Sequence, residues 1–457
     1  MTPAKNILLG KIRSGAPMTL RERFKLTLVL ALPSIFAQLS QVLMSYIDAG
    51  MVGRLGSDQA AAVGLVSTST WLFAGFCMAA TSGFTVQVAQ LIGANRFKDA
   101  RNVMRQGFTS VFAFALLIAL VGIFLSGPLP RLLGGTESVL SDASAYFLIF
   151  SAFLPVEAIW WTASAMLTSS GNTRTPGILN IITCLLDVAY NYLFIYVLDM
   201  GVKGAALGTG LATATTAILM LYFLLVRSPE LRIVGEKGRW MPDAGTLKPA
   251  WKISGPLFLQ NIISRGAYVM CTLIVAPLGT IAIAANSFAV IAESFCYMPG
   301  YGLEDSASTL VGQSIGAKRK DLARQFAMLC CASGAGMMTV LAALMYAFAP
   351  QLMSILTPDP EVIALGAKCL RIEAFAETFY GLSIVAYGAC VGAGDTLVPS
   401  ALNFGSMWLI RIGLALILIP HFGLIGYWIA MMVELNVRGI LFLIRVRGDK
   451  WMNKALI

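Results

Sequence analysis

The heptapeptide Gln90-Leu-Ile-Gly-Ala-Asn-Arg96 returns almost unchanged as Gln313-Ser-Ile-Gly-Ala-Lys-Arg319, 223 residues further along the chain. The same shift superimposes three further pairs of motifs, which are Pro33 and Pro256, Leu55-Gly56 and Leu278-Gly279, and Gly171-Asn-Thr173 and Gly394-Asp-Thr396. A single shift that holds over about 150 residues without a gap indicates an internal duplication. The sequence therefore predicts two copies of one structural unit.

The charge content of the chain excludes most soluble proteins. Of its 457 residues, 57% are hydrophobic and only 12% are charged. A soluble protein carries roughly a quarter charged residues, because water must hydrate its surface. Most of this surface must therefore face lipid, and we predict an all-α integral membrane protein.

Twelve apolar runs match the length of about 20 residues that a helix needs to cross the hydrocarbon core. They lie near residues 26–51, 61–88, 106–127, 143–168, 176–198, 204–226, 250–277, 281–312, 325–349, 363–390, 398–420 and 424–444. Backbone polar groups at membrane depth must be satisfied within the segment, so these spans are helices, and their continuous apolar character does not fit barrel strands. Each copy holds an even number of spans, so the fold is two pseudo-symmetric six-helix bundles formed by parallel repeats.

The repeat and the spans together define the predicted domains. Residues 26–226 form an N-lobe with helices 1–6, and residues 250–446 form a C-lobe with helices 7–12. Residues 1–25 and 447–457 are the terminal tails, and the polar stretch 227–249 is the linker between the lobes. The basic N-terminal tail runs directly into the first span without a clear cleavage site, so we expect a membrane helix there and not a cleaved signal.

The basic residues predict the orientation of the chain in the membrane. The tails, the linker and the loops on one side carry 25 Lys and Arg residues, whereas the opposite loops carry only Arg54, Arg131 and Lys203. Cytoplasmic loops of membrane proteins show such an excess of positive charge. Both termini are therefore predicted to be cytoplasmic, in a multi-pass protein of the plasma membrane (the inner membrane of a bacterium).

Residues typical of enzymes and metal centres are scarce. The eight cysteines lie almost entirely in apolar runs without a CxxC spacing, and the only histidine is His421. A histidine-based metal site or catalytic triad thus has no set of members, and the glycine-rich turns lack the lysine of a phosphate-binding loop. We expect no enzymatic activity, no cofactor, no metal beyond a possible sodium ion, and no nucleic-acid partner.

The motifs of both halves resemble those of the multidrug and toxic compound extrusion (MATE) family, over essentially the whole chain. The resemblance rests on Asp48-Ala-Gly-Met-Val-Gly53, Gln90-Leu-Ile-Gly-Ala94, Gly171-Asn-Thr173, Met298-Pro-Gly-Tyr-Gly302, Thr309-Leu-Val-Gly-Gln-Ser-Ile-Gly-Ala317, Gly392-Ala-Gly-Asp-Thr396 and Gly423-Leu-Ile-Gly-Tyr-Trp428. It implies a monomeric antiporter with V-shaped lobes that exports amphiphilic, often cationic compounds in exchange for protons or sodium ions.

Helix 1 carries a polar stripe. Ser34, Gln38, Gln41, Ser45 and Asp48 follow one another at spacings of four, three, four and three residues, which places all five on one helix face. A charge at the bilayer centre costs about 2.5–3.5 kcal/mol on insertion scales, so it needs a partner or a function. The stripe suits a helix that lines an aqueous cavity; an aspartate near the outer interface, where the cost is small, is the alternative. The resemblance matches Asp48 to the family's helix 1 aspartate.

A second polar pair lies on helix 5, where Asp187 and Asn191 are four residues apart and share a face. The family pattern has Asn first and Asn or Asp four residues later, so this chain departs from it by carrying the acid first. We predict that Asp48, Asp187 and Asn191, together with Gln41 and Ser45, bind the coupling proton or sodium ion. The alternative is that Asp187 is a buried carboxylate held by neighbouring donors for packing.

The second half mixes acidic and basic residues within its spans. Glu434 and Arg438 are four residues apart on helix 12 and are expected to form a local, structural ion pair. Glu293, Glu377 and Arg265 are candidates for a second site, and Glu377 lies near a cation-site acid of some relatives. Arg265 on helix 7 and Glu293 on helix 8 lie at similar depth on adjacent helices, so a structural ion pair between them is the default alternative. Some relatives carry a helix 7 glutamate where this chain has a serine followed by Arg265, which argues against a sodium site built the same way.

The substrate cavity and a hinge complete the candidate sites. The residues expected to line the cavity are Gln38, Trp160, Gln260, Asn261 and Tyr268. Aromatic rings can stack on a flat cation, although packing and interface anchoring explain many membrane aromatics equally well. Pro33 interrupts helix 1, and relatives bend this helix during transport, so Pro33 is a candidate hinge.

These observations favour an antiporter that works by alternating access on a small amphiphilic substrate in the lipid bilayer, with no obligatory protein partner. A lipid-linked saccharide flippase of the same superfamily is the first alternative, because Arg265 and Arg411 could supply a cationic cavity for a pyrophosphate headgroup. The acidic first half speaks against it. A channel would show flux without a coupled gradient, and an intramembrane enzyme would need paired catalytic groups.

Overall fold

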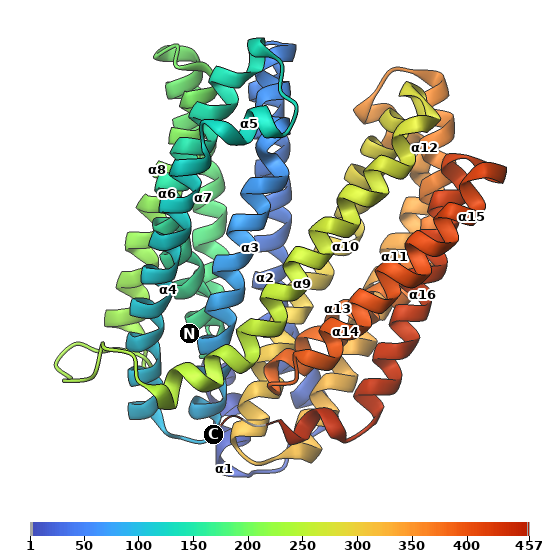
Figure 1. Ribbon diagram of the computed structural model, residues 1–457. Helices are drawn as coiled ribbons and strands as arrows, with labels where there is room; N and C mark the ends of the chain where they lie inside the picture. The colour runs from blue at the N-terminus through green and yellow to red at the C-terminus, as the bar shows by residue number, and fades with distance from the viewer. Residues whose placement is uncertain (1–2, 455, 457) are drawn as a thin grey trace. The chain divides into compact units, whose positions relative to one another are not determined.

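The computed structural model describes residues 3–454 and 456, and every regular element among them is a helix (Figure 1). Short helices lie at the start, after the third span and near the end: α1 (Pro3–Ser14), α5 (Pro128–Leu132) and the 3₁₀ helix η5 (Lys450–Asn453). The predicted all-α class is confirmed.

Each of the twelve predicted spans coincides with a helix, or with consecutive helices that continue one another. In the first half these are α2 (Leu20–Gly53), α3 (Ser57–Gly93), α4 (Phe97–Leu125), α6 (Glu137–Ser169), α7 (Arg174–Tyr192) with the π-helix η1 (Leu193–Val197), and α8 (Gly201–Tyr222) with the π-helix η2 (Phe223–Arg227). In the second half these are α9 (Ala244–Val275) with the 3₁₀ helix η3 (Ala276–Leu278), α10 (Thr280–Gly316), α11 (Lys320–Leu356), α12 (Pro360–Glu373) with α13 (Glu377–Gly392), α14 (Leu397–Gly405) with the π-helix η4 (Ser406–Ile412) and α15 (Gly413–Phe422), and α16 (Leu424–Arg447).

Length and composition agree with a multi-pass membrane protein. Within the described residues, ten of these segments are long and apolar enough to cross a membrane, and α12 with α13, bent by 59°, would make an eleventh. The 24-residue α16 coincides with the twelfth predicted span but is not among these segments. Several helices are longer than the predicted spans: α3, α10 and α11 each hold 37 residues. At 1.5 Å per residue such a helix extends about 55 Å, well beyond a hydrocarbon core of about 30 Å.

The duplication is visible in the backbone. The equivalent helices α3 and α10 both hold 37 residues. In the turns that follow them, Asn95 and Lys318 adopt left-handed φ angles of 60° and 59°, which non-glycine residues rarely do. Further on, Gly171 and Gly394 have φ angles of 87° and 88°. Residues 223 positions apart therefore build the same turns.

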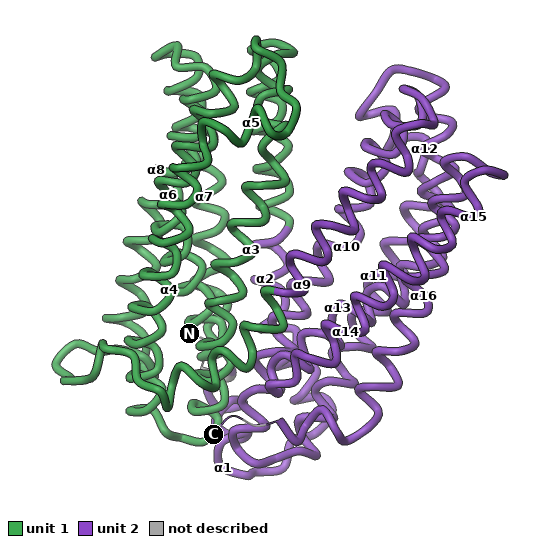
Figure 2. Tube along the Cα trace, in the orientation of Figure 1, with its two compact units in different colours: residues 1, 39–258, 457 green, residues 2–38, 259–456 purple. Residues whose placement is uncertain are grey.

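Packing divides the chain into two compact units (Figure 2). Unit 1 is Leu39–Phe258, and unit 2 consists of the segment that ends at Gln38 and of Leu259–Leu456. Both boundaries fall inside helices, so α2 and α9 each belong partly to unit 1 and partly to unit 2. The predicted lobes 26–226 and 250–446 follow the sequence repeat, whereas these units follow how the helices pack in space.

The first half of α2 is part of the core of unit 2. Leu26, Leu30 and Ala31 are fully buried there. At the start of the helix, Arg23 Nη1 donates a hydrogen bond to Gln325 Oε1 of α11 at 2.6 Å. The second half of α2 belongs to unit 1 and carries Asp48.

The first half of α9 is attached to α3 in unit 1. Ser254 Oγ donates to the carbonyl oxygen of Ala79 at 2.8 Å. Gly83 of α3 faces the backbone of Ala250, and a Cβ at Gly83 would lie 2.6 Å from the Ala250 carbonyl oxygen. A side chain at Gly83 would therefore push α9 away from α3. The first half of α2, which opens the first repeat, thus belongs to unit 2, and the first half of α9, which opens the second repeat, belongs to unit 1.

Each unit has a core of its own. In unit 1, α6 packs against α3, α4 and α8, and in unit 2, α13 packs against α10, α11 and α16. Because lipid is as apolar as the side chains, helices in membranes associate through close packing at small residues. Gly107 of α4 lies against the Phe84 side chain of α3, and Gly439 of α16 lies against the backbone of Phe379 in α13.

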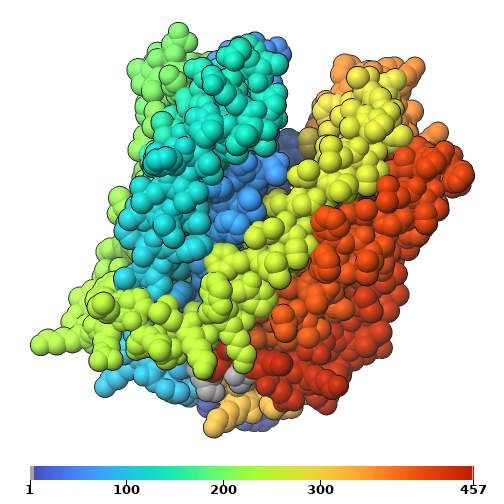
Figure 3. Space-filling model, viewed as in Figure 1, coloured from blue at the N-terminus to red at the C-terminus, as the bar shows by residue number. Residues whose placement is uncertain are grey.

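The linker between the repeats folds onto the start of α4 in unit 1 (Figure 3). Arg101 Nη1 binds Glu236 Oε1 at 2.5 Å. At the end of the linker, Asp243 Oδ1 accepts a hydrogen bond from the backbone N–H of Thr246 at 2.9 Å. This bond is the main reason why the pKa of Asp243 lies below its ordinary value. The linker thus packs on unit 1 as well as connecting the two repeats.

The N-terminal segment is also attached, in its case to unit 2. Leu8, Leu9 and Ile12 of α1 are buried in the same core as the first half of α2. Lys11 Nζ binds Glu22 Oε1 at 2.6 Å. The tail predicted for residues 1–25 therefore contains a packed helix and the first turns of α2.

Candidate functional site

Asp48 of α2 and Asp187 of α7 meet in unit 1 at the side chain of Asn191. The Nδ2 atom of Asn191 donates to Asp48 Oδ1 at 2.9 Å and to Asp187 Oδ2 at 3.1 Å. Asp187 and Asn191 are fully buried, and Asp48 is half-buried. One amide group therefore holds two carboxylates close together at membrane depth. These are the three residues that the sequence singles out most strongly.

A change of helix type follows directly after Asn191. The π-helix η1 takes up one extra residue per turn, and such insertions are frequent at functional sites. Tyr196 of η1 donates from its hydroxyl to the carbonyl oxygen of Met51 at 2.8 Å, and Val52 packs against Ile195. These contacts attach the end of α2 to the end of the α7 span, and thereby hold Asp48 beside Asp187.

Two glycines of α8 allow this helix to approach the site. Gly204 lies against the backbone of Phe194, where a Cβ would be 2.8 Å from the Phe194 carbonyl oxygen. One turn later, a Cβ at Gly208 would overlap the amide oxygen of Asn191 and lie 2.9 Å from its backbone nitrogen. This small-residue spacing is typical of tight helix pairs in membranes. The position of the Asn191 amide therefore depends on the missing side chain at Gly208.

Replacement of Gly208 by alanine is expected to displace the Asn191 amide from both carboxylates. We expect a large loss of ion-coupled transport and a destabilisation of about 1–3 kcal/mol, as for other overpacked sites. The melting temperature and the transport rate of the purified variant would test this. Gly64→Ala is the matched control, because a Cβ at Gly64 meets no atom within 4 Å. A Gly208→Ala protein that transports normally would show that the Asn191 amide can move without effect.

The site is rich in oxygen acceptors; its donors are the Asn191 amide and, beside Asp187, the Thr209 hydroxyl. Asp187 Oδ1 and Asn191 Oδ1 are buried and accept no hydrogen bond from the described residues. Buried acceptors of this kind cost free energy unless a partner reaches them. Carboxylate and amide oxygens are also the atoms that bind hard cations. The arrangement can therefore bind a proton or a small cation such as Na⁺.

The remaining helix 1 candidates do not join this group. Gln41 and Ser45 share the helix face of Asp48 but are exposed, and Ser45 Oγ donates to the Gln41 carbonyl oxygen at 3.1 Å. Gln38 belongs to unit 2, where its side chain interacts with Asp305 of α10. Helix α2 is continuous through Pro33, whose role as a hinge stays a prediction.

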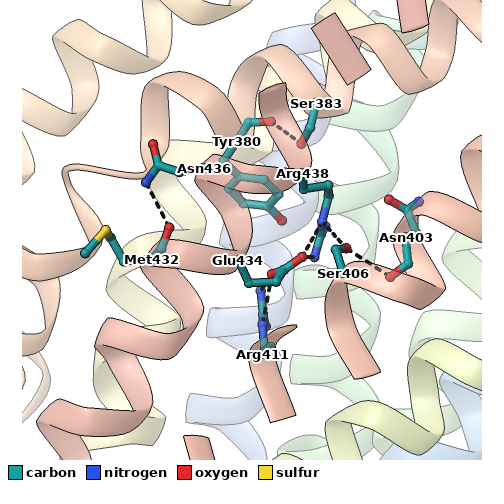
Figure 4. A network of polar contacts seen from close by, with 9 residues as sticks. All are labelled: Tyr380, Ser383, Asn403, Ser406, Arg411, Met432, Glu434, Asn436 and Arg438. Carbon is teal, nitrogen blue, oxygen red and sulfur yellow. Dashed lines mark hydrogen bonds and ion pairs between the residues drawn. The ribbon is translucent and has the colours of Figure 1, made fainter. Parts of the chain in front are cut away.

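Unit 2 contains a buried network in which one carboxylate lies between two guanidinium groups (Figure 4). Glu434 Oε2 accepts from Arg411 Nε at 3.1 Å and Nη2 at 2.7 Å. Glu434 Oε1 accepts from Arg438 Nε at 2.7 Å, with Arg438 Nη2 at 2.5 Å. We call these three residues the triad. The predicted Glu434–Arg438 pair is confirmed, and Arg411 from η4 is a second partner that the sequence analysis did not assign.

Three buried glutamates lie on the elements next to the triad; we call them the glutamate cluster. Glu293 is in α10, Glu373 ends α12 and Glu377 begins α13, and each is at most 5% exposed. The carboxylate oxygens of Glu373 and Glu377 have no N–H or O–H donor among the described residues, although the thiol of Cys296 lies beside Glu377. Glu373 interacts electrostatically with both other glutamates and with Arg411.

Most of the chain matches one protein family. The family model described as MatE matches residues 33–193 and 256–417. The two matched segments begin 223 residues apart, which is the shift of the internal repeat, and together they cover more than half of the chain. The chain belongs to the MATE family.

Relatives of this MATE protein match nearly its full length. A probable multidrug resistance protein NorM of Thermotoga maritima is 28% identical over 442 residues, which cover 94% of this chain and 93% of NorM. The multidrug resistance protein MdtK of Yersinia enterocolitica is 29% identical over 455 residues, with coverages of 93% and 95%. The crystal structure of the Vibrio cholerae MATE transporter VcmN in its bent form superimposes with a TM-score of 0.87 at 22% identity, and covers 95% of this chain and 98% of VcmN. The predicted two-lobed MATE fold is confirmed.

The predicted cavity residues of this MATE chain lie in different surroundings. Gln260 Oε1 accepts from Tyr387 Oη at 3.1 Å and from Ser400 Oγ at 2.7 Å in unit 2. Tyr268 is 50% exposed, and the Arg265 guanidinium lies 6.0 Å from its ring centre.

Of the other two predicted cavity residues, Asn261 is half-buried in unit 2. Trp160 is buried in the apolar core that α3, α4 and α6 form in unit 1. Its position resembles that of a packing residue more than that of an exposed aromatic surface.

Two acidic residues of the MATE chain are absent from the sequence-based candidates. Glu304 and Asp305 lie in α10, within the predicted span 281–312. Gly388 of α13 leaves room for Glu304, because a Cβ there would lie 2.7 Å from the Glu304 carbonyl oxygen. Charge within an apolar span was the available signal, and a search of that span for every Asp and Glu would have found both.

Proposed function

We propose that this protein is a secondary active antiporter that exports amphiphilic, cationic compounds in exchange for protons or sodium ions by alternating access. The observation that carries the proposal is the buried site in which Asn191 joins Asp48 to Asp187. The names of NorM and MdtK as multidrug resistance proteins support a cargo of varied chemistry.

The two carboxylates supply a reason for coupling. Two carboxylates that share a site of low dielectric constant repel each other when both are ionised. A proton or a sodium ion bound between Asp48 and Asp187 removes that repulsion, with the unpartnered oxygens of Asp187 and Asn191 as further ligands for a cation. While the ion is bound, the two carboxylates carry less net negative charge than after the ion has been released inside. The two stages of the cycle therefore differ in the charge of unit 1. No cofactor is needed for this cycle.

The cargo is expected to meet polar and aromatic groups at membrane depth. We assign Gln38, Gln260, Asn261 and Tyr268 to its cavity, because these side chains offer amides and an exposed ring for a flat cation. The excess of Lys and Arg on one side supports cytoplasmic termini in a bacterial inner membrane. Glu293, Glu377 and Arg265 remain a proposed second site. We expect the monomer to transport without a protein partner.

The alternative of a lipid-linked saccharide flippase loses one of its two supports. A pyrophosphate headgroup needs accessible cationic side chains, but Arg411 is 5% exposed and bound to Glu434. Arg265 is the remaining candidate, and it lies beside the Tyr268 ring. The acidic site in unit 1 would repel such a headgroup.

Ethidium efflux from proteoliposomes tests the proposal. The purified protein would be reconstituted and given a proton gradient or a sodium gradient separately. We expect efflux under one gradient, which then identifies the coupling ion, and no efflux when both gradients are dissipated. Equal flux with and without a gradient would instead indicate a passive facilitator. Absence of ethidium transport under both gradients would contradict the proposal and favour a lipid or anionic cargo.

A further inference from the structure

The buried charges of unit 2 do not balance by themselves. When all its members are ionised, the triad carries one surplus positive charge, because Glu434 neutralises one of its two arginines. The glutamate cluster then carries three negative charges on side chains that are at most 5% exposed. Unpaired charges in a membrane interior are expensive, and burial of several like charges is more so. The surplus of the triad can offset one ionised glutamate, and the other two need protons or a bound cation.

The triad and the cluster lie next to each other. Helix α12 packs against α10 and α16, and α16 packs against η4 and α13. Arg411 interacts electrostatically with both Glu293 and Glu373. It is also the more deeply buried of the two arginines, with a side chain 7% exposed against 12% for Arg438. Arg438 has a further partner besides Glu434, since its Nε also donates to Ser406 Oγ at 3.2 Å. The surplus charge thus acts on the cluster through Arg411.

Among the described residues outside the triad and the cluster, the titratable groups shown to interact with the cluster or with Arg411 are thiols and phenols, which are neutral at ordinary pH. Those that interact with the glutamates are Cys296 and Tyr297 of α10, Cys369 of α12 and Tyr380 of α13. Those that interact with Arg411 are Tyr268 and Cys271 of α9 and Tyr427 of α16. Two further arginines lie on neighbouring elements: Arg265 of α9 lies beside the Tyr268 ring, and Arg371 of α12 lies beside the Tyr346 ring. Arg411 is the arginine whose interaction with Glu293 and Glu373 the structure describes.

We propose that Arg411 is a built-in counter-ion of the glutamate cluster: its guanidinium, held in the membrane by Glu434, balances one ionised glutamate, so that the cluster exchanges protons without binding sodium. Glu434 is the positioning residue in this arrangement, because it neutralises part of the arginine charge and fixes where the remainder acts. The inference concerns charge balance in unit 2 and does not depend on the coupling role proposed for Asp48 and Asp187.

The test measures the melting temperature of the purified protein against pH, with and without Na⁺, and requires no transport. In Arg411→Gln the ionised glutamate loses its counter-charge, so ionisation in the folded state costs more. Stability should then fall more steeply as the pH rises from about 6 to about 9, by an extra amount on the order of 5 °C. Added Na⁺ should restore part of the stability that Arg411→Gln loses at high pH. It should not change the melting temperature of the wild-type protein.

Two further variants separate charge from geometry. Arg411→Lys keeps the positive charge and should follow the wild-type pH dependence. The double variant Arg411→Gln/Glu373→Gln removes one charge of each sign and should do the same, even if Arg411→Gln alone does not fold. Identical pH and Na⁺ responses of wild type and Arg411→Gln would overturn the inference. So would a double variant as impaired as the single one, because the contact would then be purely structural.

Discussion

Export driven by an ion gradient is expected to disappear when Asp48 is replaced by asparagine, while the protein remains folded and inserted. The amide oxygen of the new side chain can still accept the hydrogen bond that Asn191 now gives to Asp48. What it removes is the negative charge beside Asp187, and with it the repulsion that a bound proton or sodium ion relieves. The loss should therefore appear in ethidium efflux, down to the level of empty liposomes, and not in the melting temperature.

Asp187→Asn should have the same effect, because Asn191 joins both carboxylates. Asp58→Asn is the matched control: Asp58 is exposed in the first turn of α3, at the start of the next helix after α2. Its replacement should leave efflux unchanged. If Asp48→Asn transported like the wild-type protein under the same gradient, the coupling site would have to lie elsewhere, and the buried glutamates of unit 2 would be the next candidates.

The largest loss of stability is expected from Glu434→Ala. This change leaves the side chains of Arg411 and Arg438, 7% and 12% exposed, without the carboxylate between them. Removal of one member of a buried ion pair costs about 3–5 kcal/mol, because the remaining charge is buried without compensation. The free energy of unfolding in detergent micelles, or the melting temperature, would measure the loss.

Glu361→Ala provides the comparison for this variant, since Glu361 is an exposed glutamate in the first turn of α12. Its removal should cost only a few tenths of a kcal/mol, as expected of surface charges. Arg438→Ala should fall between the two, because the Arg411–Glu434 pair survives. A Glu434→Ala protein as stable as Glu361→Ala would mean that water or lipid headgroups reach the two arginines.

The parts of the structure that depend on local pattern follow from the sequence. Apolar runs identify all twelve spans, because the bilayer imposes one length and one polarity on every helix that crosses it. The pairing of Asp187 with Asn191 on one face follows from their spacing, as does the Glu434–Arg438 pair. The repeated motif predicts the duplication that the matching turns at Asn95 and Lys318 display.

Contacts between distant segments needed the structure. Nothing in the spacing of Arg411 shows that it binds Glu434, because the two lie on separate spans and their meeting depends on how η4 packs against α16. The role of Gly208 is similar. It is one of several glycines in α8, and only the structure shows that it packs against Asn191. The division of α2 and α9 between the units cannot be read from hydropathy, since each is one continuous helix.

That division bears on how the chain is made. Domains form in the order of synthesis, with the N-terminal part first. Leu26 and Leu30 emerge from the ribosome more than 200 residues before α10 and α11, the helices of the core in which they are buried. The first half of α2 therefore lies in the bilayer without its packing partners until the second repeat has been inserted. Two half-length polypeptides, cut in the linker and produced separately, would each carry a half-helix that belongs to the other, and would reach the native state only by assembling together.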